Sequence, residues 1–447
     1  MNTRAQRGIQ PIRVLPLGFA SIILVGTLLL ALPFAREDGV PLSFFDALFT
    51  ATSATCVTGL TVVTTDAFSW FGQLVILLMM QVGGLGFMIL TANLFLLVRH
   101  KVSLFERLTL KENLGESSLT GLRTVSLRAA RYAAICEGAG FLLLLIRFLP
   151  QFGLRGAWVS LFTSVSAFCN AGFDLMGDNS LLAYVGDPLV CLVVMALIVA
   201  GGIGFAVAGD IEGACTHKKR HLQLNTRLVL CVTVGLIVVG AAAIALLEWR
   251  NPATLGGLPW YQKILASAFQ SVTLRTAGFA TVRQEQLTEA SRAISILWML
   301  VGGSPTGTAG GLKTTTYVVL FLAVWSSMHG RKKVCIGKHT IAHELVYRAL
   351  SLFLMALTLL SVALIAVCIV EANSGVSLLN LLFELTSAFC TVGLSSGVTA
   401  TASMFTRSVL ILLMFVGRVG LITFAMSLAG RDKVTAIQYP EENLPIG

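Results

Sequence analysis

Long apolar runs and shorter amphipathic runs alternate along the whole chain. The long runs lie near residues 14–35, 73–98, 132–149, 189–208, 228–247, 293–302 continued by 317–325, 349–370 and 408–429. A helix of about 20 apolar residues crosses the hydrocarbon core of a bilayer. The pattern therefore predicts an all-α integral membrane protein with eight transmembrane spans.

Each shorter run lies between the two spans of a successive pair. These runs cover Phe44–Thr55, Trp158–Phe168, Lys263–Thr273 and Leu378–Phe389. About a dozen residues are too few to cross a bilayer, and a segment that enters without crossing must be buried in protein or line an aqueous cavity. We therefore expect four re-entrant half-helices.

Each predicted half-helix leads into a loop that contains one glycine followed by Leu or Phe. The loops read Cys56-Val-Thr-Gly-Leu60, Cys169-Asn-Ala-Gly-Phe173, Arg275-Thr-Ala-Gly-Phe279 and Cys390-Thr-Val-Gly-Leu394. The residue six places before the glycine is Ser53, Ser166, Val272 or Ser387, so the similarity extends into the half-helix. A unit of helix, half-helix, loop and helix that recurs four times indicates an internal repeat.

We number these units as repeats 1 to 4. They cover residues 14–100, 128–210, 226–328 and 345–430, with pore loops at 44–60, 158–173, 263–279 and 378–394. A C-terminal tail of residues 431–447 follows. Four equivalent loops from one chain are suited to an arrangement around a single central pore.

The second helix of each repeat carries a glycine motif of its own. The motifs are Gly83-Gly84-Leu-Gly86-Phe87, Gly201-Gly202-Ile-Gly204-Phe205, Gly302-Gly303 and Gly417-Arg418-Val-Gly420, and they begin 24 or 29 residues after the loop glycine. Small residues also allow close helix packing in membranes, so a packing role stays open for repeats 1, 2 and 4.

Composition agrees with a membrane protein, since 55% of the residues are hydrophobic and only 12% are charged. A soluble domain carries about a quarter charged residues. The segments 1–17, 99–131, 209–227, 329–348 and 430–447 hold 21 of the 32 Lys and Arg, which predicts that they and both termini are cytoplasmic. The net charge of +10 is thus a topology signal, and we expect no nucleic-acid partner.

The four loops have the chemistry of a cation filter. Backbone carbonyls replace the hydration shell of potassium where the chain is extended near an axis, and glycine permits that approach. Thr391-Val392-Gly393 repeats the start of the TVGYG potassium filter, and the other loops read Val57-Thr58-Gly59, Asn170-Ala171-Gly172 and Thr276-Ala277-Gly278. We predict that potassium binds here. We expect no further metal site, because the repeat position of Cys56, Cys169 and Cys390 is Arg275 in repeat 3 and no His joins them.

These motifs together resemble the Trk/Ktr/HKT superfamily of cation transporters, most closely its KtrB-type bacterial potassium-uptake subunit. The resemblance extends over about residues 14–440. It implies a homodimer in the cell membrane with one pore per protomer, on a cytosolic nucleotide-binding regulatory ring of the KtrA type. The chain itself has no phosphate-binding motif, so we expect no tightly bound cofactor, with potassium as substrate and sodium as a candidate activator. The basic segments are suited to docking the ring or to contacting membrane lipids.

The second helix of repeat 3 is interrupted at residues 301–314. This segment contains five glycines and one proline, which do not sustain a straight helix, and its residues of interest are Gly302, Gly303, Ser304, Pro305, Gly307, Gly310, Gly311 and Lys313. The resemblance implies an intramembrane gating loop below the filter, with a merely structural kink as the alternative. Lys313 is either part of that gate or simply the start of the resumed helix.

Arg418 lies in the otherwise apolar last span. A charge there costs about 2.5–3.5 kcal/mol on insertion scales unless it is paired or faces water. The resemblance places Arg418 at the pore, where its charge opposes cation passage, and pairing with a carboxylate or with loop carbonyls is the alternative. Glu137 is expected to be an ion-pair or packing residue. Asp46 and Glu384 either lend negative potential to the outer mouth or bind nearby loop backbone.

The leading function is channel-like potassium uptake driven by the membrane potential. A sodium-permeable or sodium-coupled transporter of the same superfamily is the nearest alternative, although in plant relatives a glycine at the position of Gly59 is associated with potassium. An integral-membrane enzyme is the alternative from a different class. His339 and His343 have the spacing of metal ligands on a helix, but a solvated helix start accounts for them better.

Overall fold

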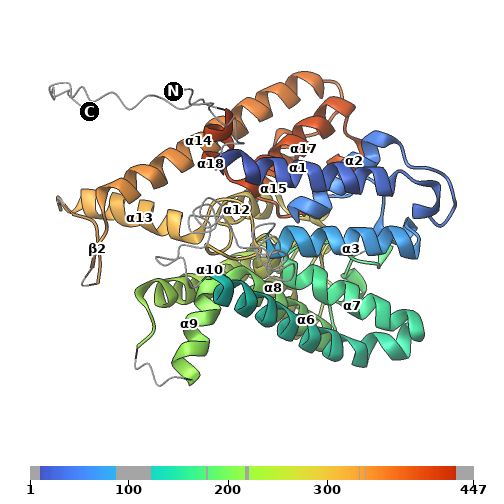
Figure 1. The fold of residues 1–447 in the computed structure, drawn as a ribbon, viewed down its shortest axis with the longest axis horizontal. Coiled ribbons are helices and arrows are strands. Elements are labelled where there is room, and N and C mark those ends of the chain that lie inside the picture. The colour runs from blue at the N-terminus through green and yellow to red at the C-terminus, as the bar shows by residue number, and fades with distance from the viewer. Residues whose placement is uncertain are drawn as a thin grey trace, which may run out of the picture.

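The computed structural model describes residues 11–86, 122–177, 180–216, 221–331, 333–337 and 339–428. Regular structure in these residues is helical apart from one antiparallel hairpin, β1 (Cys335–Ile336) with β2 (His339–Thr340), which projects beyond α13 and α14 in Figure 1. The predicted all-α class is confirmed. His339 lies in β2 whereas α14 begins at His343, so these two histidines do not share a helix face.

A long helix opens each repeat. These helices are α1 (Pro11–Leu30), α6 (Leu122–Phe152), α10 (Leu224–Glu248) and α14 (His343–Val370). They contain the four described segments that are, taken singly, long and apolar enough to cross a membrane. Apolar side chains such as Val238 and Ile365 are 60% and 62% exposed on them, as expected of helix faces that contact lipid tails.

Short helices lie at the positions of the four predicted half-helices. They are α2 (Phe44–Cys56), α7 (Leu154–Cys169), α11 (Trp260–Thr273) and α15 (Leu378–Phe389). Ser43 and Ser377 cap α2 and α15, because each hydroxyl accepts a backbone N–H of the first turn. The C-terminal parts of all four half-helices are buried, so the loops that follow them begin in the interior of the molecule.

A second helix follows each loop. These helices are α3 (Trp70–Leu85), α8 (Pro188–Ile203), α12 (Glu289–Leu300) and α17 (Met404–Val419). Each begins at a side chain that accepts a backbone N–H of the first turn, namely Ser69, Asp187, Thr288 or Ser403. The connections before them contain the short helices η2 (Thr65–Ala67), η4 (Leu182–Tyr184), η5 (Gln284–Gln286) and α16 (Val398–Thr401), and a further one, η1 (Pro33–Ala35), lies between α1 and α2.

Three of the second helices end at the last glycine of their motif. Gly86, Gly204 and Gly420 have φ angles of 83°, 97° and 93°, which no right-handed helix contains. Beyond Gly204 the chain resumes as α9 (Phe205–Thr216), and beyond Gly420 as α18 (Leu421–Leu428), at 97° and 103° to the preceding helices. The predicted spans at 189–208 and 408–429 are therefore not straight helices, because each bends at a glycine.

The predicted interruption in repeat 3 is confirmed. Helix α12 ends at Leu300 and α13 (Thr314–Met328) begins after the loop. The described residues thus hold four continuous spans, or six if each bent pair counts as one. The part of the predicted span 73–98 beyond Gly86, the predicted tail at 431–447, and most of the basic segments 1–17 and 99–131 lie outside the described residues.

Candidate ion-binding ring and intramembrane loop

The half-helices of repeats 1, 2 and 4 end in the same backbone turn. Val57, Asn170 and Thr391 adopt left-handed backbone, with φ angles of 58°, 59° and 52°. The amide that follows each of them donates to the carbonyl five residues earlier, Thr58 to Ser53, Ala171 to Ser166 and Val392 to Ser387, each at 2.8 Å. Bonds of this span form a Schellman motif, which turns the chain sharply out of a helix.

Repeat 3 reaches a similar turn by a tighter route. Thr276 also has a left-handed φ of 68°, but the amide of Ala277 donates to the carbonyl of Thr273, only four residues earlier, at 3.0 Å. β-Branched residues such as Val57, Thr276 and Thr391 rarely adopt this conformation, and strained backbone of this kind concentrates at functional sites. The four loops therefore combine different side chains with a common backbone requirement.

The loop glycines lie against one another. Gly59, Gly172, Gly278 and Gly393 all have φ between 71° and 93°. A Cβ built on Gly59 would lie 2.6 Å from the carbonyl oxygen of Ala171, and one on Gly172 would lie 2.9 Å from that of Ala277. Only a residue without a side chain fits in these positions.

The remaining two contacts close the circle. A Cβ on Gly278 would lie 2.8 Å from the carbonyl oxygen of Val392, and one on Gly393 would overlap that of Thr58. In every repeat, the residue before the glycine thus places its carbonyl beside the glycine of a neighbouring repeat. We call Thr58, Ala171, Ala277 and Val392, with the glycines that follow them, the carbonyl ring. Oxygens from four equivalent positions can together replace water around a dehydrated cation.

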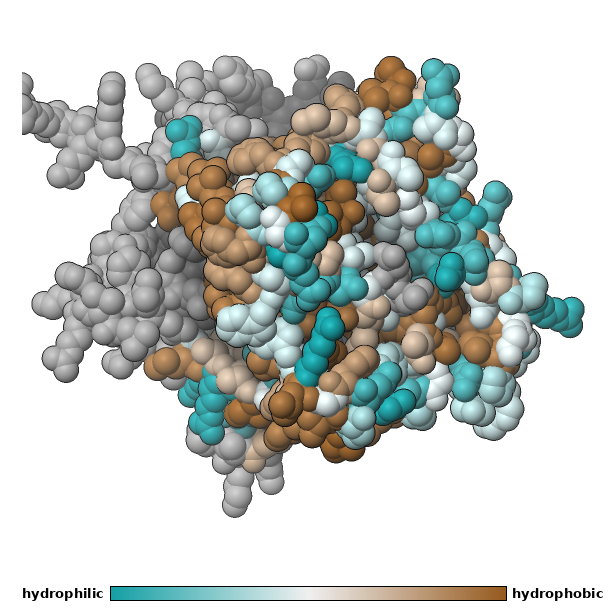
Figure 2. Space-filling model, turned by 90° about the vertical axis from the view of Figure 1, so that its right-hand side faces the viewer, coloured by the Kyte–Doolittle hydropathy of each residue, from teal (hydrophilic) through white to brown (hydrophobic). Residues whose placement is uncertain are grey.

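A cavity of about 410 Å³ lies on one side of the carbonyl ring, and we call it the vestibule. It is lined by all four loop glycines and by residues that follow them, including Asp174. The Asp174 carboxylate accepts from the hydroxyl of Ser180 (2.6 Å) and the amide of Met176 (3.0 Å), and burial raises its pKa to about 6. Figure 2, which views the end of the molecule on the right of Figure 1, shows hydrophilic residues spread among hydrophobic ones.

The loop 301–313 contacts repeat 2 on the opposite side of the ring. The amides of Ser304 and Thr308 donate to the carbonyls of Gly202 and Gly201 in α8, at 2.9 and 3.2 Å. The hydroxyl of Thr308 donates to the carbonyl of Phe168, near the end of half-helix α7, at 3.1 Å. Three donors of the loop, which would be costly to leave unpaired in the membrane interior, are thereby paired.

The same loop contacts repeat 4. Gly310 packs against the side chain of Thr391 and Gly311 against Cys390, so a Cβ at either position would meet these residues. These contacts lie before the loop glycine in the chain, whereas the vestibule is lined by the glycine and residues after it. The ring therefore separates the vestibule from the loop 301–313.

The loop 301–313 is also bonded to itself. The amide of Gly302 donates to the carbonyl of Leu312 (2.9 Å), and that of Thr314 to the carbonyl of Gly303 (3.1 Å). Lys313 precedes the first residue of α13, and its ammonium donates to the carbonyl of Ala309 at 2.6 Å. Lys313 thus precedes the resumed helix and its side chain binds the loop, while a part in the gate stays a prediction.

Arg418, near the end of α17, joins this loop to repeat 1. Its guanidinium donates to the carbonyl oxygens of Thr308, Gly83 and Gly84. Arg418 is therefore paired with one carbonyl of the loop and two of α3, and its effect on cation passage stays a prediction. Sequence reasoning did not identify Thr308, Gly83 or Gly84 as partners, because a carbonyl group is present in every residue and leaves no signal in the sequence.

The packing role of the glycine motifs is confirmed. A Cβ on Gly83, Gly201 or Gly417 would overlap the carbonyl oxygen of Thr55, Phe168 or Phe389, each four residues before the loop glycine of the same repeat. The second helix of these repeats therefore lies directly on the end of its own half-helix. The cysteines pack in the same region, Cys169 against Gly84 and Cys390 against Gly311. Within the described residues, no three His, Cys, Asp or Glu side chains are placed to hold a metal.

The acidic residues of the predicted membrane region have local partners. Glu137 accepts two hydrogen bonds from the side-chain amide of Gln81, at 2.9 and 3.1 Å, and Asp46 forms an ion pair with Arg407 at 3.2 Å. Glu384 accepts from the hydroxyl of Ser395 (2.5 Å) and the amide of Thr399 (2.9 Å), in the chain that follows the repeat 4 loop. For Glu384 the structure thus contains the backbone-binding alternative.

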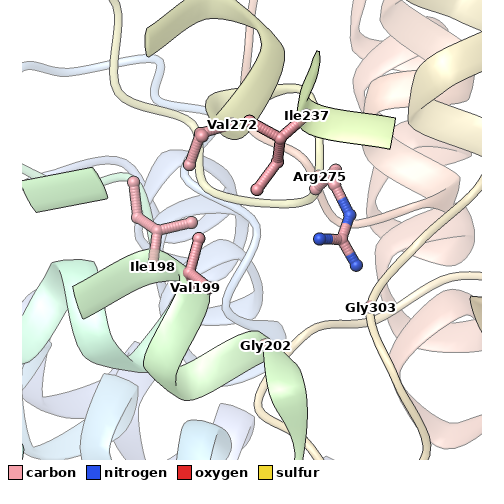
Figure 3. A pocket seen from close by; sticks show the side chains of 7 residues that line it. All are labelled: Ile198, Val199, Gly202, Ile237, Val272, Arg275 and Gly303. Carbon is pink, nitrogen blue, oxygen red and sulfur yellow. The ribbon is translucent and has the colours of Figure 1, made fainter. Parts of the chain in front are cut away.

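Arg275 is a buried charged residue to which the sequence pattern assigned no role. It is 6% exposed, and its Nε has no hydrogen-bond partner among the described residues. Figure 3 shows its guanidinium directed from the repeat 3 loop towards Gly303. The small cavity beside it, of about 10 Å³, has room for about one water molecule. A buried positive charge therefore lies between the repeat 3 loop and the loop 301–313.

Comparison with known proteins gives concordant results. The family model "TrkH: Cation transport protein" matches residues 19–435. The "Potassium/sodium uptake protein NtpJ" of Enterococcus hirae is 37% identical, with 100% of this chain and 99% of that protein covered. The "Ktr system potassium uptake protein B" of Vibrio alginolyticus is 38% identical over 97% and 94% of the two chains, and that of Bacillus subtilis is 37% identical over 96% and 95%.

A solved structure shares the fold. The crystal structure of the potassium transporter TrkH from Vibrio parahaemolyticus matches with a TM-score of 0.73 at 17% sequence identity, covering 96% of this chain and 87% of that one. The resemblance drawn from the motifs is thereby confirmed, as are a multi-pass membrane protein and a transporter rather than an enzyme. The chain belongs to the TrkH family of cation transport proteins.

Proposed function

We propose that this protein takes up potassium across the cell membrane through a selectivity filter made by the four pore loops around one central pore. The observation that carries the proposal is the carbonyl ring, in which equivalent residues of four repeats place their oxygens beside one another's glycines. Such a ring replaces lost hydration without any charged ligand, so an ion can both enter and leave. The names of the relatives from Vibrio alginolyticus and Bacillus subtilis, which specify potassium uptake, support it.

Transport of sodium as well as potassium is the second candidate, because the relative from Enterococcus hirae is named for both ions. Each loop of this chain has one glycine where the TVGYG filter has two, which supplies fewer complete carbonyl rings. Sodium then acts either as a permeant ion or as an activator. Eight membrane crossings, arranged as four repeats, are part of the proposal, with bent second helices in repeats 2 and 4.

The loop 301–313 is proposed as the gate. It contacts repeats 2 and 4 on the side of the ring away from the vestibule, where it can obstruct the path of an ion. Arg418 holds Thr308 of this loop and adds a positive charge that opposes cations. The hydrogen bonds made by Ser304, Thr308 and Lys313 keep the loop in place until a regulatory partner displaces it.

The gate is proposed to respond to a cytosolic nucleotide-binding ring of the KtrA type that binds a homodimer of this chain. The basic segments predicted to be cytoplasmic provide a surface for it and for anionic lipid headgroups. Exposed Cys335, in β1, permits a test of orientation. In a variant with no other cysteine, a membrane-impermeant maleimide applied to intact cells should leave Cys335 unlabelled, and labelling from outside would reverse the proposed topology.

Ion flux in proteoliposomes tests the function as a whole. The purified protein, reconstituted with and without its ring, is compared for uptake of potassium and of sodium under an imposed membrane potential. We expect potassium uptake that exceeds sodium uptake and that rises with the ring. Equal uptake of the two ions would favour the second candidate, and absence of flux of either would contradict both.

A further inference from the structure

Serines at the same repeat position make different bonds in different repeats. Ser53, Ser166 and Ser387, six residues before their loop glycines, are all fully buried. The hydroxyl of Ser53 accepts the amide of Gly59 and that of Ser387 accepts the amide of Gly393, both at 3.1 Å. The hydroxyl of Ser166 has no partner among the described residues, and repeat 3 has Val272 in this place.

These two bonds fix the direction of two carbonyls in the ring. The amide of Gly59 and the carbonyl of Thr58 belong to one planar peptide group, and in a trans peptide they point in opposite directions. The described residues contain no cis peptide bond. When Ser53 holds the amide of Gly59 back towards the half-helix, the carbonyl of Thr58 must point away from it. The same reasoning applies to Ser387, Gly393 and the carbonyl of Val392.

Both carbonyls belong to the carbonyl ring. The oxygen of Thr58 lies beside Gly393, and the oxygen of Val392 lies beside Gly278. The loops of repeats 1 and 4 are themselves neighbours in the ring, because Gly393 also packs against the Cα of Gly59. One half of the ring is therefore held by serine hydroxyls. In the other half, the carbonyls of Ala171 and Ala277 lack such a bond.

We propose that Ser53 and Ser387 are positioning residues that set ion selectivity by orienting the carbonyls of Thr58 and Val392, while Ser166 has no such role. This inference rests on the proposed function of the ring as a potassium filter. Without the hydroxyl, the peptide group can rotate and direct an N–H towards the ion, which repels a cation. The backbone turn itself remains, because the amides of Thr58 and Val392 still bond to the carbonyls of residues 53 and 387.

The test compares alanine and threonine variants at three positions. Ser53→Ala, Ser387→Ala and Ser166→Ala remove a hydroxyl from the same residue type at the same repeat position and burial. Ser53→Thr and Ser387→Thr retain the hydroxyl. Each protein is reconstituted in liposomes, and the initial rates of potassium and sodium uptake are measured under the same membrane potential. The ratio of the two rates reports orientation of the ring rather than the amount of folded protein.

We expect Ser53→Ala and Ser387→Ala each to lower the potassium-to-sodium ratio by about three- to tenfold, the range that one buried hydrogen bond supports. Ser166→Ala should stay within about twofold of the wild type, and the threonine variants should lie closer to wild type than the alanine variants. An unchanged ratio in Ser53→Ala and Ser387→Ala, or an equal fall in Ser166→Ala, would overturn the proposal.

Two further measurements keep the test decisive. If the alanine variants do not fold, Ser53→Cys and Ser387→Cys replace the hydroxyl by a weaker acceptor of similar size, and an unchanged ratio in them also overturns the proposal. Gly393→Ser separates this inference from the proposed function. If that variant loses selectivity while both alanine variants keep it, the filter stands and the role of the serines is wrong. If wild-type protein carries no potassium, the proposed function itself fails.

Discussion

Repeat 3 contributes the same backbone groups to the carbonyl ring as repeats 1, 2 and 4, but the side chains around them differ. Gly278 has the positive φ of the other loop glycines and meets its neighbours in the same way. Yet Val272 replaces the serine, Arg275 replaces the cysteine, and the loop 301–313 interrupts the second helix. The ring depends on backbone atoms, so a repeat can keep its contribution to the ring while its side chains change.

Repeat 3 also differs from the other repeats in how its second helix packs. Repeats 1, 2 and 4 use their second helix to pack glycines on the end of their own half-helix. In repeat 3 that place is taken by the loop 301–313, which packs on repeats 2 and 4 instead, with Arg275 directed at Gly303 (Figure 3). The comparison separates the proposed filter, to which all four repeats contribute, from the proposed gate, which belongs to repeat 3 alone.

The largest effect should come from the shared feature. Gly278→Ser and Gly393→Ser each place a Cβ against a neighbouring carbonyl at a positive φ, so both should lower the potassium-to-sodium uptake ratio by about tenfold or more, or about 1.4 kcal/mol of discrimination. The same change at Gly59 or Gly172 should act alike. Gly39→Ser is the control, since Gly39 has a φ of 69° but no atom near the added Cβ.

Selectivity that survives in Gly278→Ser but not in Gly393→Ser would show that repeat 3 has left the ring. If all four glycine variants keep their selectivity, the carbonyl ring is not the selectivity filter. Monodisperse protein in size-exclusion chromatography establishes that each variant is folded.

The next effect concerns repeat 3 alone. Deleting Thr306–Thr308 removes Thr308, which binds Gly201 and Phe168, and shortens the loop, so potassium flux without the regulatory ring should rise by about tenfold. Flux is measured in proteoliposomes at matched protein content, and dependence on the regulatory ring should fall in parallel. A folded deletion variant with wild-type or lower flux would contradict the gate.

Arg418→Gln should have a smaller effect in the same direction. It removes the positive charge and weakens the hold on Thr308, but the loop keeps its bonds to repeat 2, so we expect flux to rise by about threefold. Arg407→Gln is the matched control on the same helix, because Arg407 pairs with Asp46 and does not touch the loop. Equal changes in the two variants would mean that the helix, and not the loop contact, is responsible.

The smallest effect should come from a feature of repeat 2. Asp174 stands where the other repeats have Thr61, Ala280 and Ser395, and burial raises its pKa to about 6. As the external pH falls from 7 to 5, protonation removes this negative charge from the vestibule, so potassium uptake at low potassium should fall by about twofold.

Asp174→Asn should abolish that pH dependence and give the low-pH rate throughout. Uptake is followed at fixed internal pH. Glu285→Gln, which removes another charge from the vestibule wall, should leave the profile in place. A profile unchanged in Asp174→Asn would assign the titration to a different group.

The sequence predicted the parts of this protein that depend on local pattern. Apolar length identified the first helices, and the short amphipathic runs identified α2, α7, α11 and α15 to within a few residues. The five glycines and one proline of 302–313 identified the break in repeat 3. The same reasoning did not predict the bends at Gly204 and Gly420, because a single glycine is compatible with a continuous helix as well as with a positive φ.

What the sequence by itself determined was a membrane protein of four similar units, each with a glycine that must tolerate close approach. The length of an apolar run and the spacing of glycines are properties of the sequence, so both can be recognised without knowledge of the fold. Only the tertiary structure decided that the carbonyl of Thr58 lies beside Gly393 and that Arg418 binds Thr308, Gly83 and Gly84. These are contacts between distant backbone groups, and every residue has the same carbonyl, so packing alone selects the ones that meet.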